Sequence, residues 1–284
     1  MKLCRYGKAG SEKPGVIDAE GRLRDLSKVI TNIGPDEISP SHLKKLSSLK
    51  PETLPLVNGS PRFGVPYAGI GKFVAIGLNY SDHAKEAGLP LPSEPVVFLK
   101  ATTCINGPCD DIVQPRNSTK LDWEVELGVV IGTQARYVSE GAALSHVAGY
   151  CIVNDVSERS FQMATSQWDK GKGFDTAGPI GPWLVTTDEI RDPQNLDMAL
   201  DVNGKRMQSG NTRTMVFSVA KIISHVSHYM TLLPGDIIAT GTPPGVGLGM
   251  KPTPKFLKPG DELRLAIDGL GEQRQKVVAY RGQE

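Results

Sequence analysis

The sequence predicts a β-rich α+β protein, and three observations lead to that class. Glycine and proline are abundant, with 31 and 21 residues in a chain of 284, and they are concentrated in turns. Short apolar runs lie between these turns, and some alternate apolar and polar residues with the period of two that is typical of β-strands. Helical signals are limited to residues 41–49, 81–88, 158–165 and 216–233. Many short strands with a minority of helices are therefore expected.

Composition excludes several classes of function. The net charge is +1 and no run of Lys or Arg exceeds two residues, so a nucleic-acid partner is not expected. The first residues lack the apolar segment of a secretory signal, and no apolar run approaches the length of a membrane span. The 4 cysteines have irregular spacing that fits neither a disulfide framework nor a zinc site. Reduced thiols in a cytoplasmic protein are therefore expected.

Residues 1–70 are expected to form a small N-terminal α/β domain, followed by a catalytic domain at 71–284. Short strands are predicted at 2–6 and 15–18, with a hairpin turn at 19–21 leading into 22–26. The helix at 41–49 follows a proline, and Ser41 is placed near its N-cap. Residues 50–66 are rich in proline and glycine and predict a linker or a wrapping loop.

The stretch that organises the chain is LDWEVELGVVI, at residues 121–131. Its odd positions are all apolar, which predicts one continuous strand with one face in the core. Glu124 and Glu126 then project from the same face, with backbones roughly 7 Å apart. Two carboxylates at that distance can share one hard cation, such as Mg²⁺, which prefers oxygen ligands. The alternative is a pair of ordinary glutamates on the solvent side of an amphipathic strand.

A third carboxylate supports the metal hypothesis. Residues 150–153 form another apolar run, and it ends in Asn154 and Asp155. Asp155 therefore lies at the exit of a predicted buried strand. Together with Glu124 and Glu126 it predicts a site of three carboxylates.

The predicted helix at 81–88 carries a candidate catalytic pair. Ser81 or Asp82 is expected to cap its start, and Gly88 to end it. His83 and Glu86 are three positions apart and therefore share one helical face. A carboxylate that holds one ring nitrogen orients a histidine and raises its basicity, which suits a general base acting on water. The alternative is an exposed helix with ordinary polar residues.

Segments after Asp155 carry further candidates. Residues 158–165 place Arg159 and Gln162 on one helical face, where they bind a substrate carboxylate or oxo group, or only hydrate the helix. The glycine-rich loop at 170–175 has two lysines without the spacing of a Walker loop. A strand at 237–239 leads into TGTPPGVG, whose hydroxyls and backbone N–H groups suit the binding of a carboxylate.

The remaining strands are predicted from apolar runs and turn residues. Two of them are joined by Asn203 and Gly204, a strong hairpin signal. The predicted ranges are 73–76, 96–99, 196–202, 205–208, 262–267 and 275–280.

Taken together, the motifs resemble those of the fumarylacetoacetate hydrolase family over about residues 71–284. The segments that carry the resemblance are GLNYSDHAKEAG, FLKATTCINGP, LDWEVELGVVIG, YCIVNDVSERSFQ, KGFDTAGPIGPW, VNGKRMQSGNT and TGTPPGVG. The resemblance implies a mixed β-roll or sandwich, assembled as a homodimer or homotetramer. The N-terminal opening is similar to that of the branch with diketo-deoxy sugar-acid hydrolases and proteins called ureidoglycolate lyase.

The resemblance also implies roles for individual residues. Glu124, Glu126 and Asp155 would bind Mg²⁺ or Mn²⁺, and His83 with Glu86 would activate water from a mobile lid helix. The implied substrate-binding or oxyanion-stabilising positions are Lys172, Arg159, Gln162, Thr240, Tyr80 and Lys100.

The expected reaction is hydrolysis of the C3–C4 bond of a 2,4-dioxo acid. A six-carbon 6-deoxy diketo acid would give pyruvate and lactate. The alternatives are ureidoglycolate cleavage, oxaloacetate decarboxylation, isomerisation of a hydroxymuconate-type acid, and a non-catalytic ligand-binding module. Decarboxylation needs no attacking water, so loss of His83 would separate it from hydrolysis.

Overall fold

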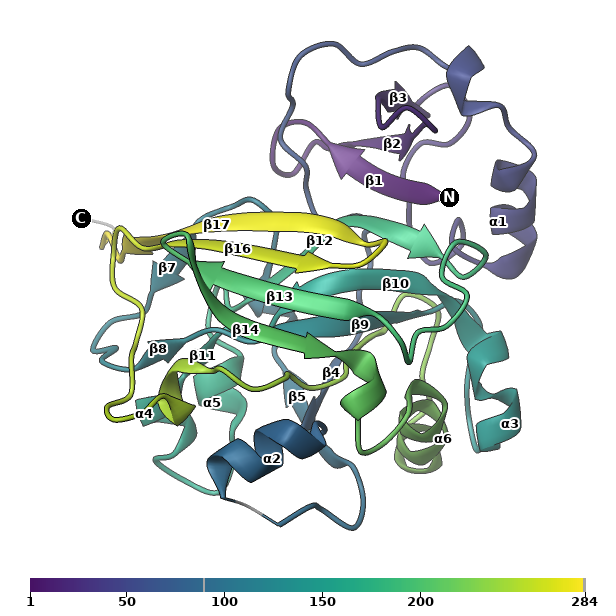
Figure 1. Cartoon of the computed structure of the whole chain (residues 1–284). Helices are drawn as coiled ribbons and strands as arrows, with labels where there is room; N and C mark the ends of the chain where they lie inside the picture. The colour runs from purple at the N-terminus through teal and green to yellow at the C-terminus, as the bar shows by residue number, and fades with distance from the viewer. Residues whose placement is uncertain (89, 283–284) are drawn as a thin grey trace.

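The computed structural model describes residues 1–88 and 90–282, and within them one large mixed sheet forms the centre of the molecule (Figure 1). The sheet has 10 strands, and β9 (Val125–Ile131) lies between two antiparallel neighbours, β10 and β15, whose ranges follow. Their order is β3 (Leu23–Asp25), β2 (Lys13–Ile17), β1 (Lys2–Tyr6), β12 (Gly178–Thr186), β10 (Val147–Asn154), β9 (Val125–Ile131), β15 (Ile237–Ala239), β4 (Phe73–Gly77) and β5 (Val96–Lys100), with β6 (Ile105–Asn106) beside β12.

A second, antiparallel-rich sheet packs across β9, β10 and β12 (Figure 1). Both faces of β9 and β10 are buried as a result, because this sheet covers one of them. A short pair, β8 (Leu121–Asp122) with β11 (Ser157–Glu158), lies beside the two sheets. The order of the second sheet is β14 (Lys205–Asn211), β13 (Asp197–Val202), β16 (Glu262–Ile267), β17 (Gly271–Ala279) and β7 (Ile112–Gln114).

Short helices surround the sheets at their edges and ends. The longest, α6, buries one apolar face, and its N-cap Ser218 accepts a hydrogen bond from the Lys221 N–H at 3.1 Å. The helices are α1 (Pro40–Ser47), α2 (Ser81–Ala87), α3 (Glu140–Ala143), α4 (Arg159–Gln162), α5 (Asp169–Lys172) and α6 (Val219–Tyr229). The strand-rich α+β class predicted from the sequence is confirmed.

The N-terminal strands extend the large sheet, since Lys2 and Leu3 of β1 pair with Val185 and Leu184 of β12. The predicted hairpin at 19–21 is confirmed, and Gly21 takes a φ of +77° in its turn. The helix begins at Pro40 with Ser39 as its N-cap, so the predicted capping role of Ser41 is wrong. The boundary near residue 70 stays a prediction.

Several predicted elements differ from those observed. The expected continuous strand at 121–131 is interrupted, because β8 ends at Asp122 and β9 begins at Val125. Tyr80 occupies the N-cap of α2, so capping by Ser81 or Asp82 is wrong, whereas Gly88 ends the helix with φ +67° as predicted. The expected loop at 170–175 begins as helix α5, and α6 is shorter than the predicted 216–233.

Strand β12 was absent from the prediction. It contains Pro179 and Pro182, and proline lacks the N–H that a strand interior donates. The predicted hairpin at Asn203 and Gly204 is confirmed, with φ of +52° and +74° at the two residues.

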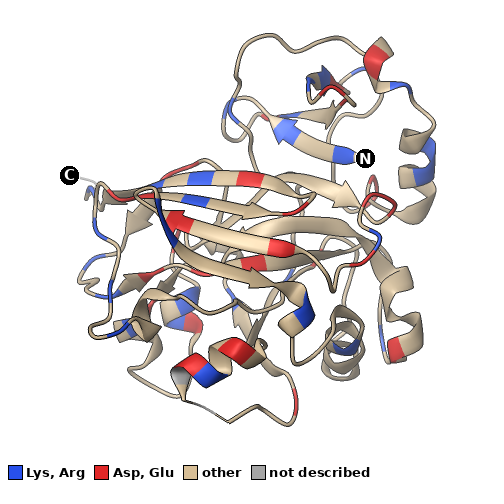
Figure 2. Cartoon of the chain, viewed as in Figure 1, with Lys and Arg blue, Asp and Glu red and all other residues tan. Residues whose placement is uncertain are grey.

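The surface and the thiols agree with the composition. Figure 2 shows Lys and Arg interspersed with Asp and Glu over both sheets and the helices, as a net charge of +1 suggests. Among the described residues all four cysteines are free thiols. None of the described helices has the length and hydropathy to cross a membrane.

Replacement of Leu200 tests the packing between the sheets. Leu200 lies on β13 with 0% of its surface exposed, so Leu200→Ala leaves a cavity. We expect the free energy of unfolding to fall by about 2–5 kcal/mol, measured by guanidinium titration. Leu200→Met, which nearly conserves volume, is the matched control and should cost less than about 1.5 kcal/mol. Equal stability of Leu200→Ala and the unmodified protein would contradict this packing.

Candidate active site

Three carboxylates meet where β9 and β10 lie side by side. Glu126 is paired with Val153 in the antiparallel register, and the Asp155 N–H donates to the Glu124 carbonyl oxygen at 2.9 Å. These backbone contacts hold the two segments so that Glu124, Glu126 and Asp155 each offer an oxygen within 4.8 Å of the others. All three side chains are buried. The structure therefore brings together the acids that the sequence predicted as a cluster.

Buried cations hold two of these acids in place. The Lys172 ammonium donates to Glu124 at 2.8 Å and to Asp155 at 2.7 Å, and the Arg159 guanidinium donates to Glu124 at 2.6 Å. Burial alone would raise the pKa of the Glu124 carboxyl, but Lys172 and Arg159 outweigh it and lower that pKa. Burial opposes the charge of Lys172 too, yet Asp155 and Glu124 raise its pKa overall. Glu124 and Lys172 are therefore both charged.

Glu126 has a different environment. Burial raises its pKa well above the usual range, and the charges of Asp155 and Glu124 raise it further. Its own hydrogen bond comes from the Gly241 N–H, at 2.8 Å. A divalent cation among these oxygens would offset the repulsion between the carboxylates, and an all-oxygen donor set suits Mg²⁺ or Mn²⁺. The residues present therefore fit the predicted metal.

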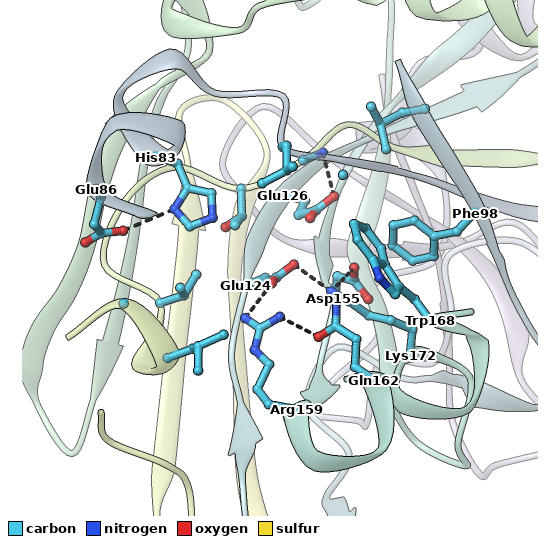
Figure 3. A pocket seen from close by; sticks show the side chains of 18 of the residues that line it. His83, Glu86, Phe98, Glu124, Glu126, Asp155, Arg159, Gln162, Trp168 and Lys172 are labelled. Carbon is cyan, nitrogen blue, oxygen red and sulfur yellow. Dashed lines mark hydrogen bonds and ion pairs between the residues drawn. The ribbon is translucent and has the colours of Figure 1, made fainter. Parts of the chain in front are cut away.

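The candidate base faces this cluster across a cavity of about 460 Å³ (Figure 3). The His83 Nδ1 and the Glu86 carboxylate are 3.1 Å apart, as their spacing on α2 predicted. With Nδ1 donating to Glu86, Nε2 is the nitrogen that accepts a proton. Glu86 in turn accepts from the Gly245 N–H at 3.1 Å, so the loop after β15 holds the pair in place.

The TGTPPGVG loop binds carboxylates, but those of the protein itself. The N–H groups of Gly241, Gly245 and Gly247 donate to Glu126, Glu86 and Asp122, respectively. A Cβ on Gly245 would lie 2.0 Å from the carbonyl oxygen of Met207, so the loop needs glycine there. The prediction that this loop suits the binding of a carboxylate is confirmed, and the carboxylates that these three N–H groups bind are the protein's own.

The structure brings most of the predicted site residues to the cavity. The predicted residues that line it are His83, Glu86, Glu124, Glu126, Asp155, Arg159, Gln162 and Lys172.

Three predicted residues are not among the described residues that line the cavity. The Thr240 hydroxyl donates to the Leu127 carbonyl at 2.9 Å, and the Tyr80 hydroxyl donates to the sulfur of Met198 at 3.2 Å. Lys100 contacts the site through Asp155, because its ammonium donates to that carboxylate at 2.5 Å. Since none of the three is among the described residues that line the cavity, their contact with substrate stays a prediction.

Sequence reasoning missed Asp122 and an aromatic wall. Asp122 is one polar position of the stretch at residues 121–131 and was not predicted to be functional, although its carboxylate accepts from Arg159 Nε at 2.8 Å. The rings of Phe98 and Trp168 meet edge to face at 5.3 Å, and the Lys172 ammonium lies 5.5 Å from the Phe98 centroid. The sequence feature that could have indicated this aromatic wall is the position of Trp168 shortly before Lys172.

Comparison with known proteins places the chain in a family. The profile described as fumarylacetoacetate (FAA) hydrolase C-terminal matches residues 72–278. A Burkholderia ambifaria protein with only a provisional hydrolase name is 61% identical over 278 residues, which are 98% of this chain and 99% of that protein. The chain belongs to the fumarylacetoacetate hydrolase family, as the sequence motifs indicated.

Solved structures agree with this assignment. A fumarylacetoacetate hydrolase from psychrophilic Exiguobacterium antarcticum has a TM-score of 0.86 at 35% identity, over 99% of this chain and 100% of that chain. A 5-carboxymethyl-2-hydroxymuconate delta-isomerase from Mycobacterium smegmatis has a TM-score of 0.77 at 30% identity, with the same coverage of 99% and 100%. The predicted family fold is therefore confirmed, and its members include hydrolases and isomerases.

Metal binding at the acidic cluster is testable without a substrate. We expect MgCl₂ or MnCl₂ to raise the melting temperature, because a ligand at 100 times its dissociation constant adds about 2.7 kcal/mol of stability. Glu126→Gln should reduce this rise by removing one ligand. Asp261→Asn, a buried carboxylate in the turn before β16, is the control and should keep the full rise. Equal rises in all three proteins, measured by calorimetry, would contradict a cation at this site.

Proposed function

We propose that the protein is a metal-dependent hydrolase that cleaves the C3–C4 bond of a 2,4-dioxo acid. The observation that best supports this proposal is that the His83 and Glu86 pair faces the three buried carboxylates across one cavity (Figure 3). The favoured substrate is a six-carbon 2,4-diketo-3-deoxy acid with a 6-deoxy end, of the rhamnonate or fuconate type. Its products are pyruvate and lactate.

His83 supplies the base. Its Nε2 accepts a proton from water, while Glu86 holds Nδ1 and stabilises the imidazolium that forms. The hydroxide oxygen bonds to C4, the C3–C4 bond breaks, and its electron pair stays on C3 as the enolate of pyruvate. The proton on His83 then returns to C3, and the carboxyl proton of the lactic acid formed at C4 passes to solvent, so atoms and charge balance.

Polar residues of the cavity bind the substrate carboxylate and stabilise the enolate. Arg159 and Gln162 line the cavity beside Glu124, which supports a role for them in binding the substrate carboxylate. The Lys172 ammonium, 2.8 Å from Glu124, stabilises the enolate charge. When bound at Glu124, Glu126 and Asp155, Mg²⁺ or Mn²⁺ supplies Lewis-acid polarisation of the 2-oxo group.

The rest of the cavity is mainly apolar, which favours a short tail that ends in a methyl group. Such a wall offers few hydrogen bonds to a chain of hydroxyl groups. The apolar residues of the wall are Ile76, Leu78, Phe98, Met163, Trp168, Val246 and Leu248.

Pyruvate release from a panel of 2,4-dioxo acids tests the proposal. We expect release with Mg²⁺, loss of release with a chelator, and the highest kcat/KM for the 6-deoxy diketo acid. His83→Ala should lower kcat about 10²–10⁴-fold, because it removes the general base. His225→Ala, on α6, is the matched control and should keep full activity. Absence of pyruvate from every acid in the panel would overturn the hydrolase proposal.

Isomerisation is the second candidate, and the similarity to a hydroxymuconate isomerase supports it. His83 can move a proton between two carbons of a dienol acid without water attack. A change in ultraviolet absorbance of a 2-hydroxymuconate-type acid without pyruvate release would favour the isomerase. Decarboxylation of oxaloacetate or ureidoglycolate cleavage that persists in His83→Ala would instead favour a lyase.

A further inference from the structure

We propose that Asp122 is a positioning residue that ties Arg159 to the loop supporting Glu86. Its carboxylate joins three parts of the site: the end of β8, helix α4 and the loop at residues 245–249. The effect on turnover rests on the proposed function, whereas the mechanical link does not.

All the acceptor capacity of Asp122 is committed. Oδ1 accepts from the N–H groups of Trp123 at 2.8 Å and Gly247 at 2.7 Å. Oδ2 accepts from Arg159 Nε at 2.8 Å and from the Leu248 N–H at 3.0 Å. The side chain is 0% exposed, so water cannot replace any of these donors.

On one side, Asp122 fixes the plane of the Arg159 guanidinium. Nε bonds to Asp122, Nη2 bonds to Glu124 at 2.6 Å, and Nη1 bonds to the Gln162 amide oxygen at 3.0 Å. A guanidinium held on three sides has one orientation, because its donors lie in a rigid fork. Loss of the Nε contact would let the group rotate away from the acid end of a substrate.

On the other side, Asp122 holds the loop by its backbone. A Cβ on Gly247 would lie 1.9 Å from the Lys255 carbonyl oxygen and 2.7 Å from Asp122 Oδ1. The close approach of Gly247 to Asp122 is therefore possible only for glycine.

The same loop reaches both the base and the cavity wall. Val246, Leu248 and Gly249 line the cavity, and the Gly245 N–H donates to Glu86 at 3.1 Å. Movement of the loop would shift Glu86, the residue that orients His83. Asp122 therefore fixes the orientation of Arg159 and the position of the His83 and Glu86 pair, without contact to the reacting atoms.

Asp122→Asn tests this role, because its amide nitrogen cannot accept from the N–H donors. The matched control is Asp236→Asn: Asp236 is 1% exposed and accepts from the N–H groups of Lys72 and Leu233, away from the cavity. By hydrogen exchange we expect the amides of residues 245–249 to exchange at least tenfold faster in Asp122→Asn and at an unchanged rate in Asp236→Asn. An unchanged rate in Asp122→Asn, or equal acceleration in both variants, would overturn the proposal.

Two further measurements complete the test. On an active 2,4-dioxo acid, Asp122→Asn should lower kcat/KM at least tenfold, and combining it with Glu86→Gln should lose less than the product of the single losses. A multiplicative loss would overturn the coupling to Glu86. If Asp122→Asn does not fold, Asp122→Glu takes its place with the same expected exchange rates, because the longer side chain moves the carboxylate away from the Gly247 and Leu248 N–H groups. Lack of turnover by the unmodified enzyme would reject the proposed function, whereas the exchange rates would still decide the role of Asp122.

Discussion

The antiparallel register of β9 and β10 is the constraint on which the site depends. It opposes Glu126 to Val153, and the hydrogen bond from the Asp155 N–H to the Glu124 carbonyl continues the alignment beyond the strands. A shift by one residue would point these acids to the other face. The second sheet, packed over both strands, makes such a shift costly because it would disrupt the packing of side chains between the two sheets.

Bringing like charges together in a buried place requires compensation, and the fold supplies it from several elements. Lys172 and Arg159 come from short helices, and Lys100 comes from the end of β5. The loop after β15 adds backbone N–H groups to Glu126, Glu86 and Asp122. The His83 and Glu86 pair and the acidic cluster are thereby held by the same loop, which fixes their positions relative to each other.

The sequence predicted the parts of the site that depend on local spacing. Glu124 with Glu126, and His83 with Glu86, follow from the periods of a strand and a helix. Arg159 with Gln162 follow from a helical period too, whereas Lys172, Thr240, Tyr80 and Lys100 came from the family resemblance. Strand β12 was not predicted because prolines rarely lie inside a strand. Its pairing with β10 shifts register between Tyr150 and Ile152, opposite the segment that contains Pro182, and this irregularity is not visible in the sequence. Asp122 could not be identified, since its partners lie 37 and 125 positions away.

The proposed function depends on the binding of one divalent cation by Glu124, Glu126 and Asp155. Anomalous diffraction from crystals grown with Mn²⁺ tests it directly, because the signal locates the ion without assumptions about the reaction. We expect one strong peak within coordination distance of an oxygen from each of the three side chains, about 2.0–2.3 Å away. Ordered crystals in which these oxygens remain bonded to Lys172 and no peak lies between them would contradict it.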